Sequence, residues 1–337
     1  MSLLGVIASS YKQSKASVFA LKGAYGQVGY SSDGISWNLK NDSTAPLITS
    51  TFITRANNKF VTLAQDDSGV YYFGKSDDGI TWTYTATNIV ESDEVASCVV
   101  YGNGVYVCCG FSSLYGGSFS GQDIFTNGNW YYSSDGTIWT QGTTDVYMEY
   151  VGFGGGIFVT LDLNGNVLTS SDGINWTTIE AVNAYNMSSY VYHNGLHVIG
   201  CDDNSGGMGY VVIGNGTNWY RHTIDSSYQF APGKIVYGNN VFLAVGYPDS
   251  GYNSTNICAV SSNGVNWTVG YLPYSDEWGS ATFGNGIFMV MHALQPNFLS
   301  PSSYYATSTD GLTWTGYNPP YDPNSGASGD KYYVTFG

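Results

Sequence analysis

The side chains of this chain that could carry acid–base chemistry are few. Hydrolysis of a glycosidic bond uses a pair of carboxyl groups, one as the acid and one as nucleophile or base. The sequence of 337 residues contains five Glu, and two of them, Glu149 and Glu277, stand just before segments expected to be strands. Exposed acids are common, so the alternative is that both are solvated loop carboxylates. We expect no catalytic residue.

Metal-ligating residue types are present without a metal-ligating pattern. The five Cys form no Cys-x-x-Cys pair, and Cys98, Cys108 and Cys109 fall in expected strands as small core residues. His193 and His197 flank an Asn-Gly pair, but two ligands do not complete a zinc site. The stretches 66–69 and 202–207 could offer oxygen ligands to calcium, but neither has EF-hand spacing, and we interpret both as surface loops. The sequence predicts no metal and no cofactor.

Charge and composition exclude two classes of partner. The net charge is −15, and the ten Lys and Arg residues are scattered, whereas a phosphate-binding surface needs clustered cations. We therefore expect no nucleic acid, and no apolar run is long enough for membrane insertion. With 44 Gly and 30 Tyr, the composition is typical of strands and tight turns.

One pattern, Ser-x-Asp-Gly-x-x-Trp, recurs seven times, with a degenerate fifth copy. Its repeated residues are Asp33, Trp37, Asp78, Trp82, Asp135, Trp139, Asp172, Trp176, Trp219, Asn263, Trp267, Asp310 and Trp314. Asp-Gly and Asn-Gly are the preferred centre of a two-residue type I′ hairpin, in which both residues have positive φ. That turn places Trp37 opposite Tyr30 and puts Ile35 on the same apolar face, packed on a neighbouring unit. Ser31 would point the other way.

A second hairpin, centred on Asn-Gly or a similar pair, alternates with the first. Its copies lie at 55–60, 101–106, 153–158, 192–197, 237–242, 283–288 and, near the C-terminus, 328–333. The same turn predicts that the flanking aromatic residues face each other. The predicted pairs are Tyr101 with Tyr106, Phe153 with Phe158, Tyr237 with Phe242 and Phe283 with Phe288.

Seven hairpins of each kind predict an all-β fold, a seven-bladed β-propeller of four-stranded blades. The second hairpin supplies strands A and B of each blade, and the first supplies strands C and D. The chain begins with a C–D hairpin and ends with an A–B hairpin, so we expect the N- and C-terminal hairpins to pair in one blade, with 326–336 beside 27–39. Such closure removes free sheet edges, whereas an open stack would need caps.

The propeller accounts for residues 25–337, and residues 1–24 match neither repeat. We expect them to form an N-terminal arm; the alternative is a disordered tail.

The Ser-x-Asp-Gly-x-x-Trp copies resemble the Asp-box (BNR) repeat of sialidase-like propellers, although that repeat has one residue between Asp and Gly. The resemblance spans 25–337 and implies structural roles for the Asp and Trp of each copy, but it says little about activity. Sialidase-like enzymes hold the substrate carboxylate with three Arg. This chain has only Arg55 and Arg221, so sialidase activity is not expected.

The opening segment, residues 3–10, and the Tyr- and Gly-rich repeats resemble tail and fibre proteins of tailed phages. This resemblance implies a virion protein.

Recognition is the function for which the sequence offers residues. The connections from strand D to strand A carry aromatic candidates for ligand binding: Tyr147, Tyr185, Tyr228, Tyr274, Trp278 and Tyr321. The B–C connection at 110–129 is unusually long, and both connection types share one face, opposite the tight turns. Loops on a rigid scaffold commonly carry binding sites. The alternative is that these aromatic side chains cover the core.

The leading hypothesis is a non-enzymatic phage virion protein, structural or receptor-binding, such as a tail fibre, tail accessory or capsid decoration. It would be made in the host cytoplasm and exposed on the extracellular particle. The arm would contact other virion proteins, and the loops a host surface glycan or protein. A second hypothesis is a lectin-like, carbohydrate-binding propeller outside any virion, and a third is a glycoside hydrolase.

Overall fold

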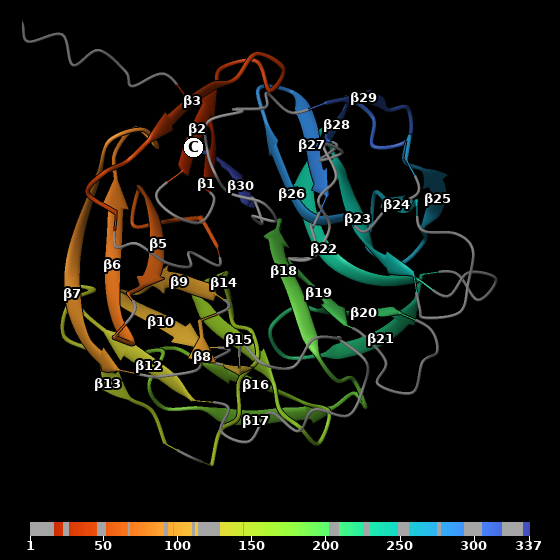
Figure 1. Ribbon diagram of the computed structural model, residues 1–337. Helices are drawn as coiled ribbons and strands as arrows, with labels where there is room; N and C mark the ends of the chain where they lie inside the picture. The colour runs from red at the N-terminus through yellow and green to blue at the C-terminus, as the bar shows by residue number, and fades with distance from the viewer. Residues whose placement is uncertain are drawn as a thin grey trace, which may run out of the picture.

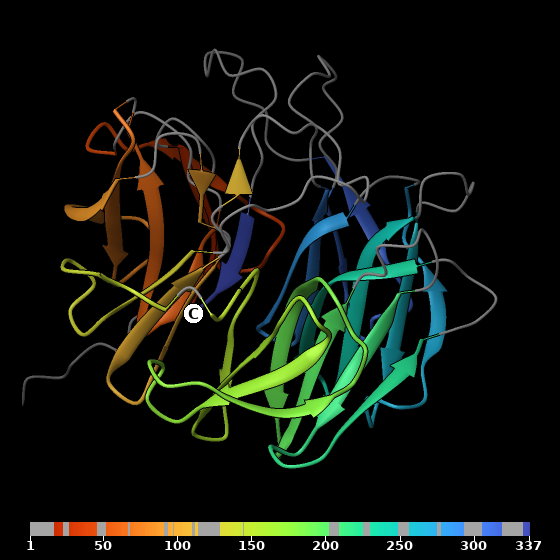
Figure 2. The same cartoon turned by 90° about the horizontal axis from the view of Figure 1, so that it is seen from below.

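The predicted propeller is confirmed. A computed structural model describes residues 17–22, 27–45, 52–66, 68–90, 94–96, 98–109, 112–113, 129–143, 145–201, 209–224, 230–248, 256–274, 278–292, 305–318 and 333–337. Within these ranges every regular element is a β-strand, and seven four-stranded antiparallel sheets surround one axis (Figure 1). Figure 2 shows the same ring from the side. The described residues contain no helix long and apolar enough to span a membrane.

Each blade runs from inner strand A to outer strand D, and we number the blades along the chain. Blade 1 consists of β30 (Tyr333–Phe336), β1 (Phe19–Lys22), β2 (Gln27–Ser31) and β3 (Asn38–Asn41). Blade 2 consists of β4 (Thr54–Ala56), β5 (Lys59–Gln65), β6 (Val70–Ser76) and β7 (Trp82–Val90). Blade 3 consists of β9 (Cys98–Gly102), β10 (Val105–Cys109), β12 (Trp130–Ser133) and β13 (Thr140–Gln141). Blade 4 consists of β14 (Gly152–Gly154), β15 (Ile157–Leu161), β16 (Asn166–Ser170) and β17 (Thr177–Ala181).

The remaining blades follow the same order. Blade 5 consists of β18 (Met187–His193), β19 (Leu196–Cys201), β20 (Tyr210–Gly214) and β21 (Trp219–Thr223). Blade 6 consists of β22 (Phe230–Gly238), β23 (Val241–Pro248), β24 (Ile257–Ser261) and β25 (Thr268–Tyr271). Blade 7 consists of β26 (Trp278–Gly284), β27 (Ile287–His292), β28 (Tyr305–Ser308) and β29 (Thr315–Tyr317). A small sheet pairs β8 (Glu94–Val95) with β11 (Ser112–Ser113). The A strands contact one another in a closed ring.

The A–B hairpins have the predicted geometry. Asn103 and Gly104 both have positive φ, at 49° and 87°, as a type I′ turn requires. The four predicted aromatic pairs are opposite one another. The turn also joins blades, because the Asn103 side-chain amide donates to the carbonyl oxygens of Gly156 and Ser171 in blade 4, at 2.9 and 2.8 Å.

The C–D turns differ from the prediction. Positive φ occurs at Gly34 but not at Asp33, and six residues, 32–37, rather than two, connect β2 and β3. The reason is that Asp33 Oδ1 accepts hydrogen bonds from the backbone amides of Ile35 and Ser36, at 2.8 and 2.7 Å, which opens the turn. The Oγ of Ser31 accepts a further bond from the Gly34 amide at 2.8 Å. Through these bonds the Asp33 side chain shapes its own turn.

The wider turn shifts the C–D register by one residue. Tyr30 lies opposite Asn38, so the predicted pairing of Tyr30 with Trp37 is wrong. A one-residue shift exchanges the two faces of a strand. Ser31 is accordingly buried instead of turned to solvent, whereas Ile35 lies in the wider turn itself and is 46% exposed instead of packed. The Trp residues still pack on the preceding blade, as expected.

The closing blade is correctly placed but differently composed. The N-terminal part of the chain supplies three strands, including β1, which falls inside the predicted arm, and the C-terminal part supplies only β30. The predicted pairing of two terminal hairpins is therefore wrong in this detail. The sequence feature that indicates β30 as an inner strand is the final Thr335-Phe336-Gly337, which matches Thr282-Phe283-Gly284 at the end of β26. Residues 1–16 and 319–332, with most of the expected hairpin at 328–333, lie outside the described residues.

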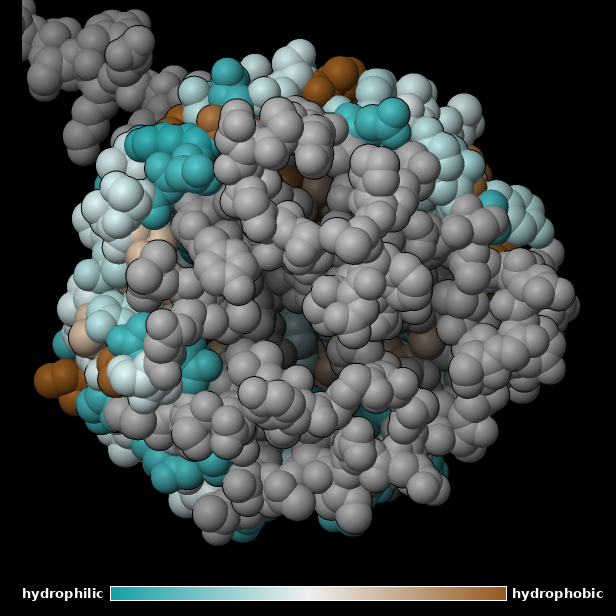
Figure 3. Space-filling model, in the orientation of Figure 1, coloured by the Kyte–Doolittle hydropathy of each residue, from teal (hydrophilic) through white to brown (hydrophobic). Residues whose placement is uncertain are grey.

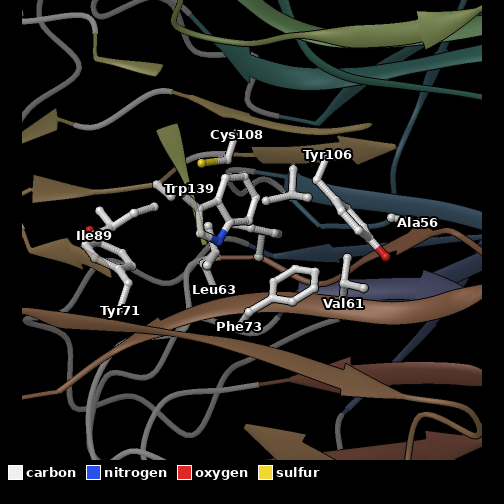
Figure 4. Packing of buried hydrophobic residues seen from close by; sticks show 12 residues of the cluster. Ala56, Val61, Leu63, Tyr71, Phe73, Ile89, Tyr106, Cys108 and Trp139 are labelled. Carbon is white, nitrogen blue, oxygen red and sulfur yellow. The ribbon is translucent and has the colours of Figure 1, made fainter. Parts of the chain in front are cut away.

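The core lies between blades. Each of the seven blade interfaces holds one cluster of buried apolar side chains among the described residues. Figure 4 shows the cluster between blades 2 and 3, where Trp139 packs beside Phe73 and Tyr106. The Phe73 and Trp139 ring centroids are 5.9 Å apart, edge to face. Gly136 lies so close to the Phe73 ring that a Cβ would be only 2.2 Å from it, so this turn position needs glycine.

Candidate recognition cleft

Two of the six predicted aromatic residues lie in one cleft. Tyr147 and Glu149, from the connection between blades 3 and 4, face Tyr185 and Asn186, from the connection between blades 4 and 5. The B–C connection of blade 4 forms the third wall, through Leu161, Asp162 and Leu163. The cleft is small, with a volume of about 40 Å³ accessible to water, and it opens to solvent. All three walls belong to the face opposite the tight turns.

Hydrogen bonds fix the walls that carry Tyr147 and Tyr185 at their bases. The Thr160 hydroxyl, at the end of β15, donates to the Tyr150 carbonyl oxygen at 2.8 Å and holds the connection that carries Tyr147. The backbone amide of Tyr185 donates to the Tyr210 hydroxyl oxygen at 3.1 Å, which positions the opposite wall. Both tyrosine side chains of the cleft are half-buried, so their rings keep accessible area.

The acidic wall is shaped by its own hydrogen bonds. Asp162 Oδ1 accepts from the backbone amides of Asn164 and Asn166, at 2.9 and 2.8 Å, and Oδ2 accepts from the Asn166 side chain at 2.8 Å. The turn docks on the neighbouring connection, because the Val182 amide donates to the Gly165 carbonyl oxygen at 3.0 Å. These bonds give Asp162 a structural part in the cleft.

The residues that line the cleft suit binding. Tyrosine rings offer apolar faces and a hydroxyl, and carboxylate and amide groups accept or donate hydrogen bonds, which are the contacts that a neutral polar ligand needs. The described residues that line this cleft include neither Lys nor Arg, so these residues do not favour an anionic ligand. Leu163 is 59% exposed at its edge and adds apolar surface.

The other predicted candidates do not join this cleft. Trp278 is fully buried at the start of β26, so its side chain covers the core, which is the alternative that the sequence left open. Tyr274 packs over Gly316 and accepts a hydrogen bond from the Trp278 indole at its carbonyl oxygen, at 3.3 Å, so it covers the core. Tyr228 and Tyr321 lie outside the described residues.

Sequence reasoning missed Asp162, Leu163 and Asn186. The B–C connection of blade 4, residues 162–165, is short and carries no aromatic residue, so it gave no signal. Asn186 has a positive φ of 50°, a conformation that Asn tolerates, and could be suspected only as a turn residue.

The residues considered for catalysis or metal binding do not come together among the described residues. Arg55 lies over the Phe60 ring in blade 2, whereas Arg221 lies over the Tyr210 ring in blade 5. His193 stacks on Tyr237, with ring centroids 3.6 Å apart. The described residues contain no group of three His, Cys, Asp or Glu side chains placed to hold a metal ion. Glu277, the proposed partner of Glu149, lies outside them.

His197 is part of the core of blade 5. Its Nδ1 is 2.7 Å from the Tyr190 hydroxyl, and burial lowers the pKa of its imidazole to about 4. The side chain is therefore neutral at physiological pH.

The surface around the ring is polar. In the view of Figure 3 the described rim is mostly hydrophilic, with separate hydrophobic residues. Single exposed apolar side chains need no partner.

Comparison with known proteins shows the fold and no family. No protein-family model matches the chain, and no curated protein matches it. Solved structures that resemble it include the computationally designed Ika8 protein, with 9% identity, coverage of 94% of this chain and 96% of that one, and a TM-score of 0.56. A nidogen/laminin complex matches with 11% identity, 82% and 97% coverage and a TM-score of 0.51. YCF48 bound to a D1 peptide matches with 14% identity, 81% coverage of each chain and a TM-score of 0.50.

Proposed function

We propose that this chain is a non-enzymatic recognition protein of a phage particle, and that it binds a host surface glycan in the cleft between Tyr147 and Tyr185. The observation that carries the binding part is the meeting of two aromatic side chains and a pinned acidic wall in one open cleft. A saccharide ring stacks its apolar face on an aromatic side chain and hydrogen-bonds to carboxylate and amide groups at its edge.

Further features support a binding role. The cleft is built from connections on a closed, rigid ring, which is a common way to present a recognition site. Two of the similar structures contain a bound protein or peptide, in the nidogen/laminin complex and in YCF48 with its D1 peptide. The place on a virion rests on the resemblance of residues 3–10 and of the repeats to phage tail proteins.

Two measurements test the proposal. Purified protein is applied to a glycan array and to whole bacterial cells, and purified phage particles are searched for the chain by mass spectrometry. Presence in particles together with glycan binding supports the proposal. Glycan binding without presence in particles supports the lectin-like alternative, and presence without any binding supports a decoration role.

The hydrolase alternative needs its own readout. Glycans that bind are incubated with the protein and examined for cleavage products. Turnover that is lost in a Glu149→Gln variant would overturn the non-enzymatic proposal.

A further inference from the structure

Two cysteines of blade 3 face each other across neighbouring strands. Cys98 begins β9 and Cys109 ends β10, and the two are direct partners in the antiparallel register. Their Sγ atoms are 3.3 Å apart. The structure describes all five cysteines, and none forms a disulfide.

The other three cysteines have no cysteine opposite them. Cys108 faces Val99 and Tyr131. Cys201 faces Met187 and Tyr210, and Cys258 faces Val245 and Gly270. The fold therefore selects one pair.

The backbone already has the spacing that a disulfide needs. Directly opposed residues of an antiparallel pair have Cα atoms about 4.5–5.5 Å apart, within the disulfide range of about 4.4–6.8 Å. The sulfur atoms must approach by about 1.3 Å to reach bonding distance. A change of this size calls for side-chain rotation and leaves the strand register unchanged.

The pair lies behind the wall of the recognition cleft. Cys98 and Cys109 share a buried cluster with Met148 and Val151. Cys98 Sγ is 4.0 Å from the Val151 carbonyl oxygen. Tyr147 and Glu149, from the same connection, line the cleft. A bond between the two sulfur atoms would tie the ends of β9 and β10 beneath this connection.

We propose that Cys98 and Cys109 are an oxidation site that closes to a cross-strand disulfide in the presence of a small disulfide such as oxidised glutathione. One cysteine thiolate attacks the glutathione disulfide and releases one reduced glutathione. The second thiolate then displaces the remaining glutathione from the mixed disulfide. Two thiol protons leave, two electrons pass to the oxidant, and two molecules of reduced glutathione are formed.

The reaction is expected to be slow in the folded protein. Burial raises the pKa of the Cys109 thiol, so little thiolate is present at neutral pH. The rate should increase as the pH is raised. The proposal concerns the bond itself and holds whatever ligand the cleft binds.

The test counts thiols in the full-length folded protein. The chain is equilibrated in oxidised glutathione, quenched with acid, denatured and alkylated, and its mass and peptides are analysed. We expect reactive thiols to fall from five to three, with the bond mapped to Cys98 and Cys109. A Cys108→Ala variant should still lose two thiols, whereas a Cys98→Ala variant should lose none.

Three results would overturn the proposal. They are retention of all five thiols at equilibrium, a bond mapped to Cys108, and glutathione that remains attached to single cysteines.

Discussion

Val18 and Gly337, near the two ends of the chain, exchange both backbone hydrogen bonds. The Val18 amide donates to the Gly337 carbonyl oxygen at 2.9 Å, and the Gly337 amide donates to the Val18 carbonyl oxygen at 3.1 Å. In blade 7 the equivalent pair, Gly284 and Ile287, flanks a two-residue turn. The ring of blades is therefore closed by non-covalent contacts at the place where the other blades have an A–B turn.

The C-terminal strand β30 should contribute as much to the stability of the fold as the inner strand of another blade. The Phe336 ring lies 4.9 Å from Phe19 and packs over Gly284. We expect Phe336→Ala to lower the free energy of unfolding by about 2 kcal/mol, through lost burial and the cavity left behind. Urea unfolding measures it, with Phe283→Ala in blade 7 as the matched variant. A Phe336→Ala protein as stable as wild type would show that β30 does not close the ring.

Lys22 is a buried cation at an otherwise apolar position. The registers make it equivalent to Leu63 in blade 2 and Met291 in blade 7. It is 2% exposed, and its Nζ donates to the Tyr84 hydroxyl oxygen at 2.8 Å. Burial lowers the pKa of Lys22 to about 8, and the charge of Asp42 opposes part of that shift.

Replacement of Lys22 by Met should stabilise the protein. At pH 7 the lysine is charged in both states, so folding carries the cost of desolvating it, and we expect Lys22→Met to gain about 2 kcal/mol. Between pH 8 and 10 the folded protein has lost the Lys22 proton that the unfolded protein keeps, so the stability of the wild type rises with pH. The stability advantage of Lys22→Met over the wild type therefore shrinks across this range. Denaturant unfolding at several pH values measures both effects. The exposed Lys40→Met is the control, and a destabilised Lys22→Met would contradict the prediction.

The Asp-Gly turns should weaken in acid. The amide of Thr313, together with that of Leu312, lowers the pKa of Asp310 to about 2. The stability that this carboxylate contributes is complete above about pH 4 and is lost as the pH falls toward 2. Hydrogen bonds lower the pKa of Asp33, Asp135 and Asp172 in the same way.

An asparagine can form the turn without titrating, as Asn263 does in blade 6 with bonds of 2.9 Å to two amides. We therefore expect Asp310→Asn to keep the fold and to be less stable than wild type at pH 7, with a difference that disappears near pH 2. Thermal unfolding across this range checks it, with Asp145→Asn as the control. A stability difference between Asp310→Asn and the wild type that does not change with pH would contradict the stabilising role of the ionised Asp310 side chain.

The tryptophan indoles differ in what they contribute. Trp139 Nε1 donates to the Gly136 carbonyl oxygen at 2.9 Å, whereas buried Trp219 Nε1 has no partner among the described residues. The variants Trp139→Phe and Trp219→Phe remove similar buried apolar surface, but only Trp139→Phe also removes a hydrogen bond. We expect Trp139→Phe to be less stable than Trp219→Phe by about 1 kcal/mol in urea unfolding. Equal losses would mean that the Trp139 bond adds nothing.

The two cleft tyrosines should dominate glycan binding. We expect Tyr147→Ala and Tyr185→Ala each to weaken the affinity for a glycan found on the array by about tenfold, because each removes a stacking surface. Titration calorimetry measures the affinity. Tyr220→Ala and Tyr271→Ala, which alter tyrosines 60% and 53% exposed on outer strands, are the controls. If only the controls lose affinity, the ligand binds at the rim.

The repeats were sufficient to predict the architecture. Asn103-Gly104 and its relatives encode their turn locally, because both positions need positive φ, and the aromatic pairs beside them follow from a register that the turn sets. Local backbone preference and a period of two therefore determined the blades, their number and the split closure.

Tertiary contacts decided the rest. The C–D register depends on side-chain hydrogen bonds to Asp33, which residue pattern alone does not reveal. The inner strand of blade 1, β30, has no A–B turn to mark it in the sequence, because Gly337 meets Val18 only after the ring has closed. The cleft needs Tyr147, Asp162 and Tyr185 from three separate connections, and their spacing along the chain carries no information about that meeting. Local sequence sets turns and strands, whereas a site between blades exists only after long-range packing brings its walls together.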